Sequence, residues 1–178
     1  GVIGEGEETI SELADWLSGG KDYSRLNKIK GLVFKDVSGE FRRTGLRPWV
    51  ENLDSLPFPA WELFPAPAGG RREFPVFASR GCPYQCKFCM RMMGDKVRRR
   101  SARNILEELL RNRRITETNF FWFSDETFGV DKAWLDKLLD ALIENKGLLN
   151  MHWSANSRVN LADAHIYSRM KEAGCVEV

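Results

Sequence analysis

The sequence has no long hydrophobic run. No apolar stretch approaches the ~20 residues that a membrane-spanning helix requires, and the amino terminus carries no signal-peptide pattern. The net charge is only +2 over 178 residues, which is too small to indicate a nucleic-acid partner. A content of 43% hydrophobic and 29% charged residues is ordinary for a globular chain with one sizeable core. We therefore expect a protein that neither spans a membrane nor binds nucleic acid.

Cysteine is also scarce, with four residues, three of which stand in one short stretch: Cys82, Cys86 and Cys89. So few thiols, clustered in this way, argue against a disulfide framework. Their spacing is C-x3-C-x2-C, with the aromatic Phe88 just before the last. Thiolates are soft ligands that favour iron–sulfur clusters, zinc and copper(I), and three of them leave one metal position free. We expect Cys175, far along the chain, to be a small apolar residue that opens a buried strand.

Two other uses of these cysteines stay open from the residues alone. A thioredoxin-like pair formed by Cys86 and Cys89 leaves Cys82 unexplained. A structural zinc site needs a fourth ligand, and neither His152 nor His165 is near in sequence. The cluster interpretation uses all three thiols, and we favour it for that reason.

The first part of the chain predicts a helix, a hairpin and a linker. A helix is expected from residue 8 to 17, and 31–35 with 40–43 are typical of a small hairpin. The apolar face of the helix is predicted to comprise Ile10, Leu13, Ala14 and Leu17. Prolines in 56–67 then fix the backbone in an extended form, which indicates a semi-rigid connector.

The rest of the chain alternates between strand and helix patterns. Such alternation predicts an α/β fold of right-handed parallel units. The expected strands are 74–79, 119–124, 151–156 and one that opens at Cys175, and the expected helices are 102–112, 131–145 and 161–173. The run 119–124 is apolar throughout, which is typical of a strand covered on both faces. An eight-unit barrel needs about 250 residues, so we expect a fragment of a longer protein that holds only the first half of a barrel.

The segment Ala78-Ser79-Arg80-Gly81-Cys82, followed by Pro83-Tyr84-Gln85-Cys86-Lys87-Phe88-Cys89, resembles the cluster loop of radical S-adenosylmethionine (SAM) enzymes. It is most similar to the branch that carries a cobalamin-binding domain before the radical domain. The resemblance implies that the three cysteines hold a [4Fe–4S] cluster, that SAM chelates its fourth iron, and that one electron splits SAM into methionine and a 5′-deoxyadenosyl radical.

The same resemblance implies a domain organisation. Residues 1–45, with the stretch Gly4-Glu5-Gly6-Glu7, look like the tail of a Rossmann-like cobalamin-binding domain. Residues 46–73, with Leu56-Pro57-Phe58-Pro59, look like the linker, and residues 74–178 look like the amino-terminal half of a partial parallel (β/α) barrel of radical SAM type.

Polar residues follow each of the first three predicted strands of this barrel. In parallel α/β barrels the site lies at the carboxyl ends of the strands, where the cysteines, 125–127 and 156–158 all fall. The resemblance places Asp125 and Glu126 near the amino group of SAM, Arg158 at its carboxylate, Ser154 at its ribose and Phe88 near its adenine. The plainer alternatives are a helix-capping role for Asp125 and an exposed loop position for Arg158. No residue is assigned an acid–base role.

The expected activity is reductive cleavage of SAM, in the service of cobalamin-dependent methylation or ring formation on a small-molecule substrate. The expected cofactors are the [4Fe–4S] cluster, SAM and cobalamin, with an electron donor such as flavodoxin or ferredoxin. Because free thiols destined for a cluster need a reducing compartment, a cytoplasmic location is expected. The rival hypotheses are an iron–sulfur electron-transfer module without SAM cleavage and a structural zinc domain.

Overall fold

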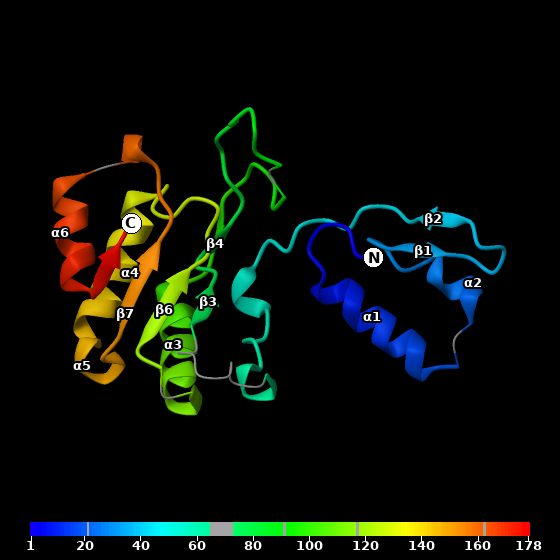
Figure 1. Ribbon diagram of the computed structural model, residues 1–178, viewed down its shortest axis with the longest axis horizontal. Helices are drawn as coiled ribbons and strands as arrows, with labels where there is room; N and C mark the ends of the chain where they lie inside the picture. Colours follow the sequence, from blue (N-terminus) through cyan, green and yellow to red (C-terminus); the bar gives the residue numbers. More distant parts are fainter. Residues whose placement is uncertain (21, 65–72, 91, 117, 162) are drawn as a thin grey trace. The chain divides into compact units, whose positions relative to one another are not determined.

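The structure is a computed structural model that describes residues 1–20, 22–64, 73–90, 92–116, 118–161 and 163–178 (Figure 1). The chain divides into two compact units, residues 1–51 and 52–178. Among the described residues, no helix has the length and apolar character needed to cross a membrane. Most of the proline-rich stretch after residue 64 lies outside the described residues.

The first unit contains the expected helix and hairpin. The helix α1 spans Glu7–Ser18, a short helix α2 spans Tyr23–Leu26, and the strands β1 (Val33–Lys35) and β2 (Phe41–Arg43) pair in antiparallel register. Asp36 accepts hydrogen bonds from the backbone N–H groups of Ser38 and Glu40, which folds the turn between the two strands.

The buried face of α1 differs from the predicted one. Ile10 and Leu17 are exposed, whereas Thr9 and Trp16 are buried. The Thr9 hydroxyl donates to the carbonyl of Lys30, and the Trp16 indole N–H donates to the carbonyl of Asp22. Trp16 also packs in a buried cluster with Leu26, Ile29 and Leu32. Apolar periodicity registers neither hydrogen bond.

The second unit is built on a parallel sheet of four strands. Its strands are β3 (Phe74–Val76), β6 (Phe120–Phe123), β7 (His152–Ala155) and β8 (Cys175–Glu177), and they lie in the order β3-β6-β7-β8. The intervening helices are α3 (Ala102–Thr116), α4 (Lys132–Glu144) and α6 (Ala164–Glu172). Because each new strand joins the same edge without a reversal, the arrangement is that of a barrel wall rather than a doubly wound sheet. The predicted β-α-β-α-β-α-β order and partial-barrel fold are confirmed.

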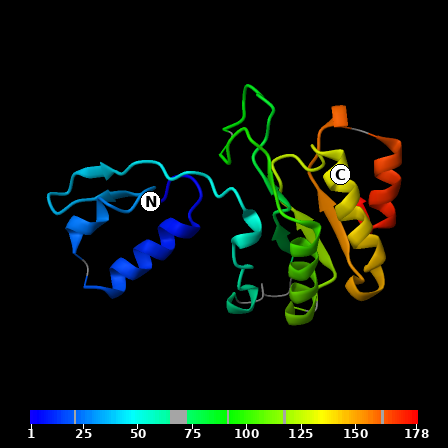
Figure 2. The same cartoon turned by 180° about the vertical axis from the view of Figure 1, so that it is seen from behind.

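The helices α3, α4 and α6 of this unit cover one face of the sheet, with α3 and α4 side by side (Figure 2). Phe121 and Phe123 point into that layer and are fully buried. Trp122 points the other way and is 39% exposed. The expectation that all of 119–124 is covered is therefore wrong for Trp122, because successive residues of a strand face opposite sides of the sheet.

Side-chain caps set the starts of the helices. Ser101 Oγ accepts from the N–H of Asn104, Asp131 accepts from Trp134, and Asp163 accepts from His165 and Ile166. Several predicted bounds differ from the observed ones. The last helix begins at Ala164 rather than at residue 161, and α3 continues to Thr116 rather than ending at residue 112. The helix α4 ends at Glu144, and a short helix α5 (Lys146–Leu149) follows it.

Glycine is required where α6 turns into β8. Gly174 has a φ of +98°, and a Cβ at this position would lie 2.6 Å from the carbonyl oxygen of Met151. The residue also bonds to the sheet, since its carbonyl accepts from the N–H of Trp153 at 3.1 Å. Backbone and sheet therefore meet here with no room for a side chain.

We predict that Gly174→Ala lowers the free energy of unfolding by about 1–3 kcal/mol, the cost of a strained backbone position. Urea-induced unfolding of the purified protein measures this. The matched control is Gly147→Ala in α5, where a Cβ meets no atom within 4 Å. That change should be neutral or stabilise the protein by up to about 1 kcal/mol. Equal destabilisation by both changes would contradict the packing argument.

Candidate functional site

The cysteine loop leaves the sheet through a short antiparallel ribbon. The strands β4 (Ser79–Arg80) and β5 (Arg98–Arg99) pair with each other, so the expected strand 74–79 is in fact β3 followed by a separate element. The loop that they close projects beyond the carboxyl ends of β6 and β7 (Figure 1). This is the edge at which parallel α/β barrels carry their sites.

The neck of the loop is tight. Gly81 has a φ of +92°, and a Cβ there would collide with the carbonyl oxygen of Lys96 across the ribbon. The next residue, Cys82, donates its N–H to the carbonyl of Gly94 at 3.0 Å. Only glycine permits this approach, and the result is that Cys82 is held, buried, at the base of the loop.

Asp125 fastens the entry to this neck from the end of β6. Its Oδ1 accepts from the backbone N–H of Ala78 at 2.8 Å, and its Oδ2 accepts from the hydroxyl of Ser79 at 2.5 Å. The side chain is only 3% exposed. Burial raises its pKa to about 7, although the hydrogen bonds from Ser79 and Ala78 and the charge of Arg100 act to lower it. The helix-capping alternative for Asp125 is wrong, because Asp131 caps α4.

Arg100 fastens the exit from the loop. Its backbone N–H donates to the carbonyl of Ala78 and its guanidinium donates to the carbonyl of Phe77, each at 3.0 Å. The same guanidinium pairs with Glu108 of α3, whose side chain is 2% exposed. The two ends of the cysteine loop are therefore tied to the sheet and to α3 by buried polar groups.

The three thiols of the loop differ in exposure. Cys82 is buried, Cys86 is half-buried and Cys89 is exposed, and none of the four cysteines forms a disulfide. The N–H of Cys89 donates to the carbonyl of Cys86 at 3.0 Å, which brings these two residues into one turn. Among the described residues, no three Cys, His, Asp or Glu side chains are gathered as a metal-ligand set. The structure therefore places the thiols in one loop and does not bring the three sulfur atoms together.

Two of the thiols contact loops that follow other strands. The sulfur of Cys82 lies 3.2 Å from the hydroxyl of Thr127, which also donates to the carbonyl of Glu126 at 2.7 Å. The guanidinium of Arg158 donates to the sulfur of Cys86 at 3.0 Å. The loops after β3, β6 and β7 thus meet at the cysteines, as the carboxyl ends of neighbouring parallel strands require.

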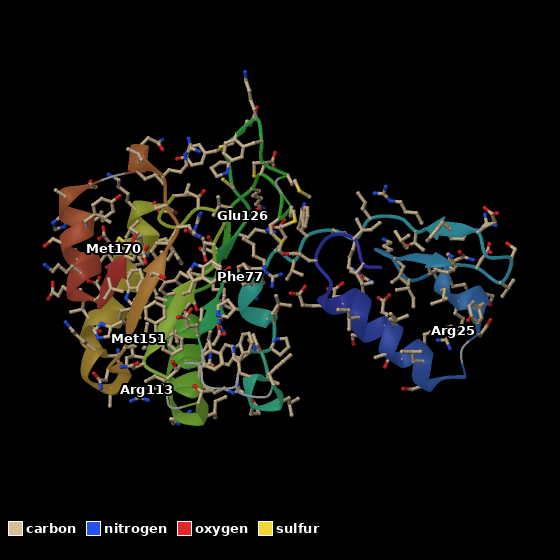
Figure 3. The ribbon with its side chains drawn as sticks, viewed as in Figure 1. Arg25, Phe77, Arg113, Glu126, Met151 and Met170 are labelled. Carbon is tan, nitrogen blue, oxygen red and sulfur yellow. The ribbon has the colours of Figure 1, made fainter. Side chains whose placement is uncertain are left out.

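One carboxylate oxygen of Glu126 has no hydrogen-bond partner among the described residues. Its Oε1 accepts weakly from the N–H of Met93, 3.4 Å away, while its Oε2 is buried and has no hydrogen-bond partner among the described residues (Figure 3). Buried carboxylate oxygens normally have a donor. Glu126 directly precedes Thr127, which contacts Cys82. An unpartnered carboxylate oxygen in the loop after β6 suits an ammonium-bearing ligand, and three soft thiols in one loop suit an iron–sulfur cluster.

Two other predicted site residues stand apart from this cluster of contacts. Phe88 is 92% exposed at the tip of the loop. Ser154 points from β7 to the sheet face opposite the helices, where it lines a hollow of about 350 Å³ together with Trp122, Asn156 and Glu177.

Sequence reasoning assigned no role to two residues of the site. Tyr84 carries the guanidinium of Arg158 over its ring, 4.1 Å from the centroid, and Thr127 contacts Cys82. A signal for Thr127 was its place two residues after Asp125 at a strand end. No comparable signal marks Tyr84, because its partner is 74 positions away in the sequence.

Fold and loop together define an α/β-barrel protein whose first strand leads into a loop of three thiols. The sequence profile of the Radical SAM superfamily matches residues 76–178. Because this match covers more than half of the chain, the chain belongs to the radical SAM superfamily.

Individual proteins resemble nearly the whole chain. The uncharacterized methyltransferase PH0819 of Pyrococcus horikoshii is 35% identical over 98% of this chain and 38% of its own length. The anaerobic magnesium-protoporphyrin IX monomethyl ester cyclase of Synechocystis is 28% identical over 97% of this chain and 35% of its own length. The structure of OxsB, a cobalamin-dependent SAM radical enzyme with aqua-cobalamin and SAM bound, matches 97% of this chain and 26% of its own, with a TM-score of 0.74 and 20% identity. The chain therefore spans little more than a third of the curated relatives it matches.

We predict that the contribution of Asp125 to the free energy of unfolding falls as pH rises from about 4 to about 7. Its raised pKa means that the folded protein keeps a proton that the unfolded chain releases above pH 3.8. The loss is at most about 1.4 kcal/mol for each pH unit, and it stops above the folded-state pKa.

Urea unfolding of the wild type and of Asp125→Asn, measured between pH 4.5 and 8, tests this. The asparagine can still accept from Ala78 and can donate to Ser79, and it does not titrate. The variant should therefore show a weaker pH dependence. Identical pH slopes in the two proteins would show that Asp125 titrates normally.

Proposed function

We propose that the protein binds a [4Fe–4S] cluster and SAM, and that the reduced cluster supplies the electron that splits SAM into methionine and a 5′-deoxyadenosyl radical. The observation that carries the proposal is the C-x3-C-x2-C loop after the first strand of a radical SAM fold. Cys82, Cys86 and Cys89 would be the iron ligands. Three thiolates leave one iron without a protein ligand, which is where a chelating small molecule can bind.

The loops around the cysteines supply groups that match the methionyl part of SAM. The free, buried oxygen of Glu126 is suited to accept from its ammonium group. Arg158, after β7, has a guanidinium suited to its carboxylate. Asp125 plays a different part, because both of its oxygens already bind the loop entry. We propose that it orients the cluster loop and does not itself contact SAM.

Ser154 and Phe88 are proposed contacts for the rest of SAM. The hydroxyl of Ser154 opens onto the uncovered sheet face, where a ribose would find a hydrogen-bond partner. Phe88 presents an exposed ring beside Cys89, and a ring in that position can cover an adenine and exclude water from it.

The reaction class that we propose is cobalamin-dependent methyl transfer to a small molecule. Two relatives support it, because the Pyrococcus protein is a methyltransferase by name and OxsB is a cobalamin-dependent enzyme. The cyclase of Synechocystis supports ring formation as the alternative outcome. Residues 1–45 are proposed to be the remnant of a cobalamin-binding domain, 46–73 the linker, and 74–178 the first half of the barrel.

The same proposal sets the cellular requirements. A flavodoxin or ferredoxin is the proposed electron donor, because the cluster must be reduced by one electron at a time. Thiol ligands and a reducible cluster suit a reducing, cytoplasmic compartment.

We predict that serine at Cys82, Cys86 or Cys89 removes most of the bound iron, because a cluster with two thiolate ligands is poorly held. The full-length protein, purified without oxygen, is analysed for iron, sulfide and zinc. Cys175→Ser is the matched control, because Cys175 opens β8 and its sulfur donates to the carbonyl of Glu177. Equal loss of iron in this control would overturn the ligand assignment.

A second measurement separates the enzyme from its rivals. The reduced wild-type protein is incubated with SAM, and 5′-deoxyadenosine is measured by mass spectrometry. We expect 5′-deoxyadenosine in the wild type and none in the three cysteine variants. An iron–sulfur protein that leaves SAM intact would be an electron-transfer module, and a colourless protein that holds zinc would be a structural zinc domain.

A further inference from the structure

Arg158 is held in place by three different partners. One Nη1 hydrogen bond goes to the sulfur of Cys86 at 3.0 Å, and the Nε–H donates to the side-chain oxygen of Asn160 at 3.1 Å. The Cζ atom of the guanidinium lies over the ring of Tyr84, 4.1 Å from its centroid. Tyr84 and Cys86 belong to the cysteine loop, and Arg158 follows β7. The guanidinium therefore links the loop after β7 to the cysteine loop, and one of its contacts there is the thiol of Cys86.

We propose that Arg158 is a positioning residue that holds Cys86 and raises the reduction potential of the cluster. The inference rests on the proposed function, because it requires Cys86 to be an iron ligand. It assigns Arg158 a role toward the sulfur of Cys86, in addition to or in place of a contact with the carboxylate of SAM.

The physical reason is the charge on the guanidinium. Reduction adds one negative charge to a cluster, and part of that charge resides on the cysteine sulfurs. A cation that donates a hydrogen bond to such a sulfur stabilises the reduced state more than the oxidised state, so the potential rises. Hydrogen bonds from charged donors are the strong ones, and this donor is half-buried, where water screens it less.

The contact of Thr127 with Cys82 involves an uncharged side chain, in contrast to the contact of Arg158 with Cys86. The hydroxyl of Thr127 lies 3.2 Å from the sulfur of Cys82 but has a single hydrogen, which it donates to the carbonyl of Glu126. It brings no net charge to the cysteines. Among the described contacts with Cys82 and Cys86, the bond from Arg158 is the one that carries a full positive charge, so it is the one expected to set the potential.

The ring of Tyr84 explains why arginine suits this position. A planar guanidinium can stack on an aromatic face and donate in its own plane at the same time, which an ammonium group cannot do. A carboxylate accepts two parallel hydrogen bonds from a guanidinium, either from Nε and Nη2 or from Nη1 and Nη2. In this structure Nε–H already donates to Asn160 and Nη1 already donates to Cys86, so one donor of each pair is in use. A bidentate grip on SAM would compete with the bond to Cys86, and the two roles can be told apart.

The test is a redox titration of the cluster, monitored by electron paramagnetic resonance, on the full-length protein purified without oxygen. At a fixed solution potential, we expect Arg158→Gln to lower the ratio of reduced to oxidised cluster roughly tenfold. For a one-electron couple this is a shift of about 59 mV to more negative potential. Arg103→Gln, which removes an exposed positive charge from α3, is the matched control and should leave the potential unchanged.

Further variants separate charge from geometry. Arg158→Lys keeps the charge and should recover part of the potential. Tyr84→Phe keeps the ring and should behave as the wild type, whereas Tyr84→Leu frees the guanidinium and should lower the ratio about threefold. If Arg158→Gln cannot hold a cluster, Tyr84→Leu decides the question, and an unchanged potential in that variant would overturn the inference.

The outcomes distinguish this inference from the proposed function. A wild-type protein without an iron–sulfur cluster would contradict both the proposed function and the inference about Arg158. Suppose instead that the wild type holds a cluster, and that Arg158→Gln leaves its potential unchanged but weakens SAM binding. This result would contradict the inference alone and would assign Arg158 to the SAM carboxylate.

Discussion

The carboxylate of Asp125 joins the carboxyl end of β6 to the backbone that leads into the cysteine loop. Both of its oxygens are used, one by the N–H of Ala78 and the other by the hydroxyl of Ser79. Without this bridge, the chain between β3 and the loop would have a buried N–H and a buried hydroxyl to satisfy in some other way. The position of every thiol in the loop therefore depends on a side chain that lies 36 or more residues further along the chain.

Hydrophobic periodicity was sufficient to predict the sheet and its helices. Short strand patterns that alternate with amphipathic segments indicate parallel units, and the strand order β3-β6-β7-β8 agrees with them. Caps at Ser101 and Asp131 were readable as well, since a short polar side chain before an apolar period marks a helix start. Periodicity was less informative in α1, where the buried residues are Thr9 and Trp16, and both donate hydrogen bonds to backbone carbonyls outside the helix.

The candidate site was predictable in its location but not in its contacts. The rule that parallel strands carry sites at their carboxyl ends placed the cysteines, Asp125 and Arg158 at one edge. It could not show that Asp125 faces the backbone, that Arg158 faces a sulfur, or that Tyr84 lies beneath the guanidinium. Such contacts join residues 46 to 74 positions apart, and their choice depends on loop geometry that no local pattern encodes.

The unequal burial of the three thiols has a consequence for chemical modification. Cys82 sits at the closed base of the loop, Cys86 lies beneath a guanidinium, and Cys89 faces the solvent. Reagents such as iodoacetamide, and oxidants such as peroxide, reach a sulfur only through water, and their rates follow access and thiolate content. Damage to the loop would therefore begin at its tip and proceed inward, with Cys89 the first of the three thiols to react.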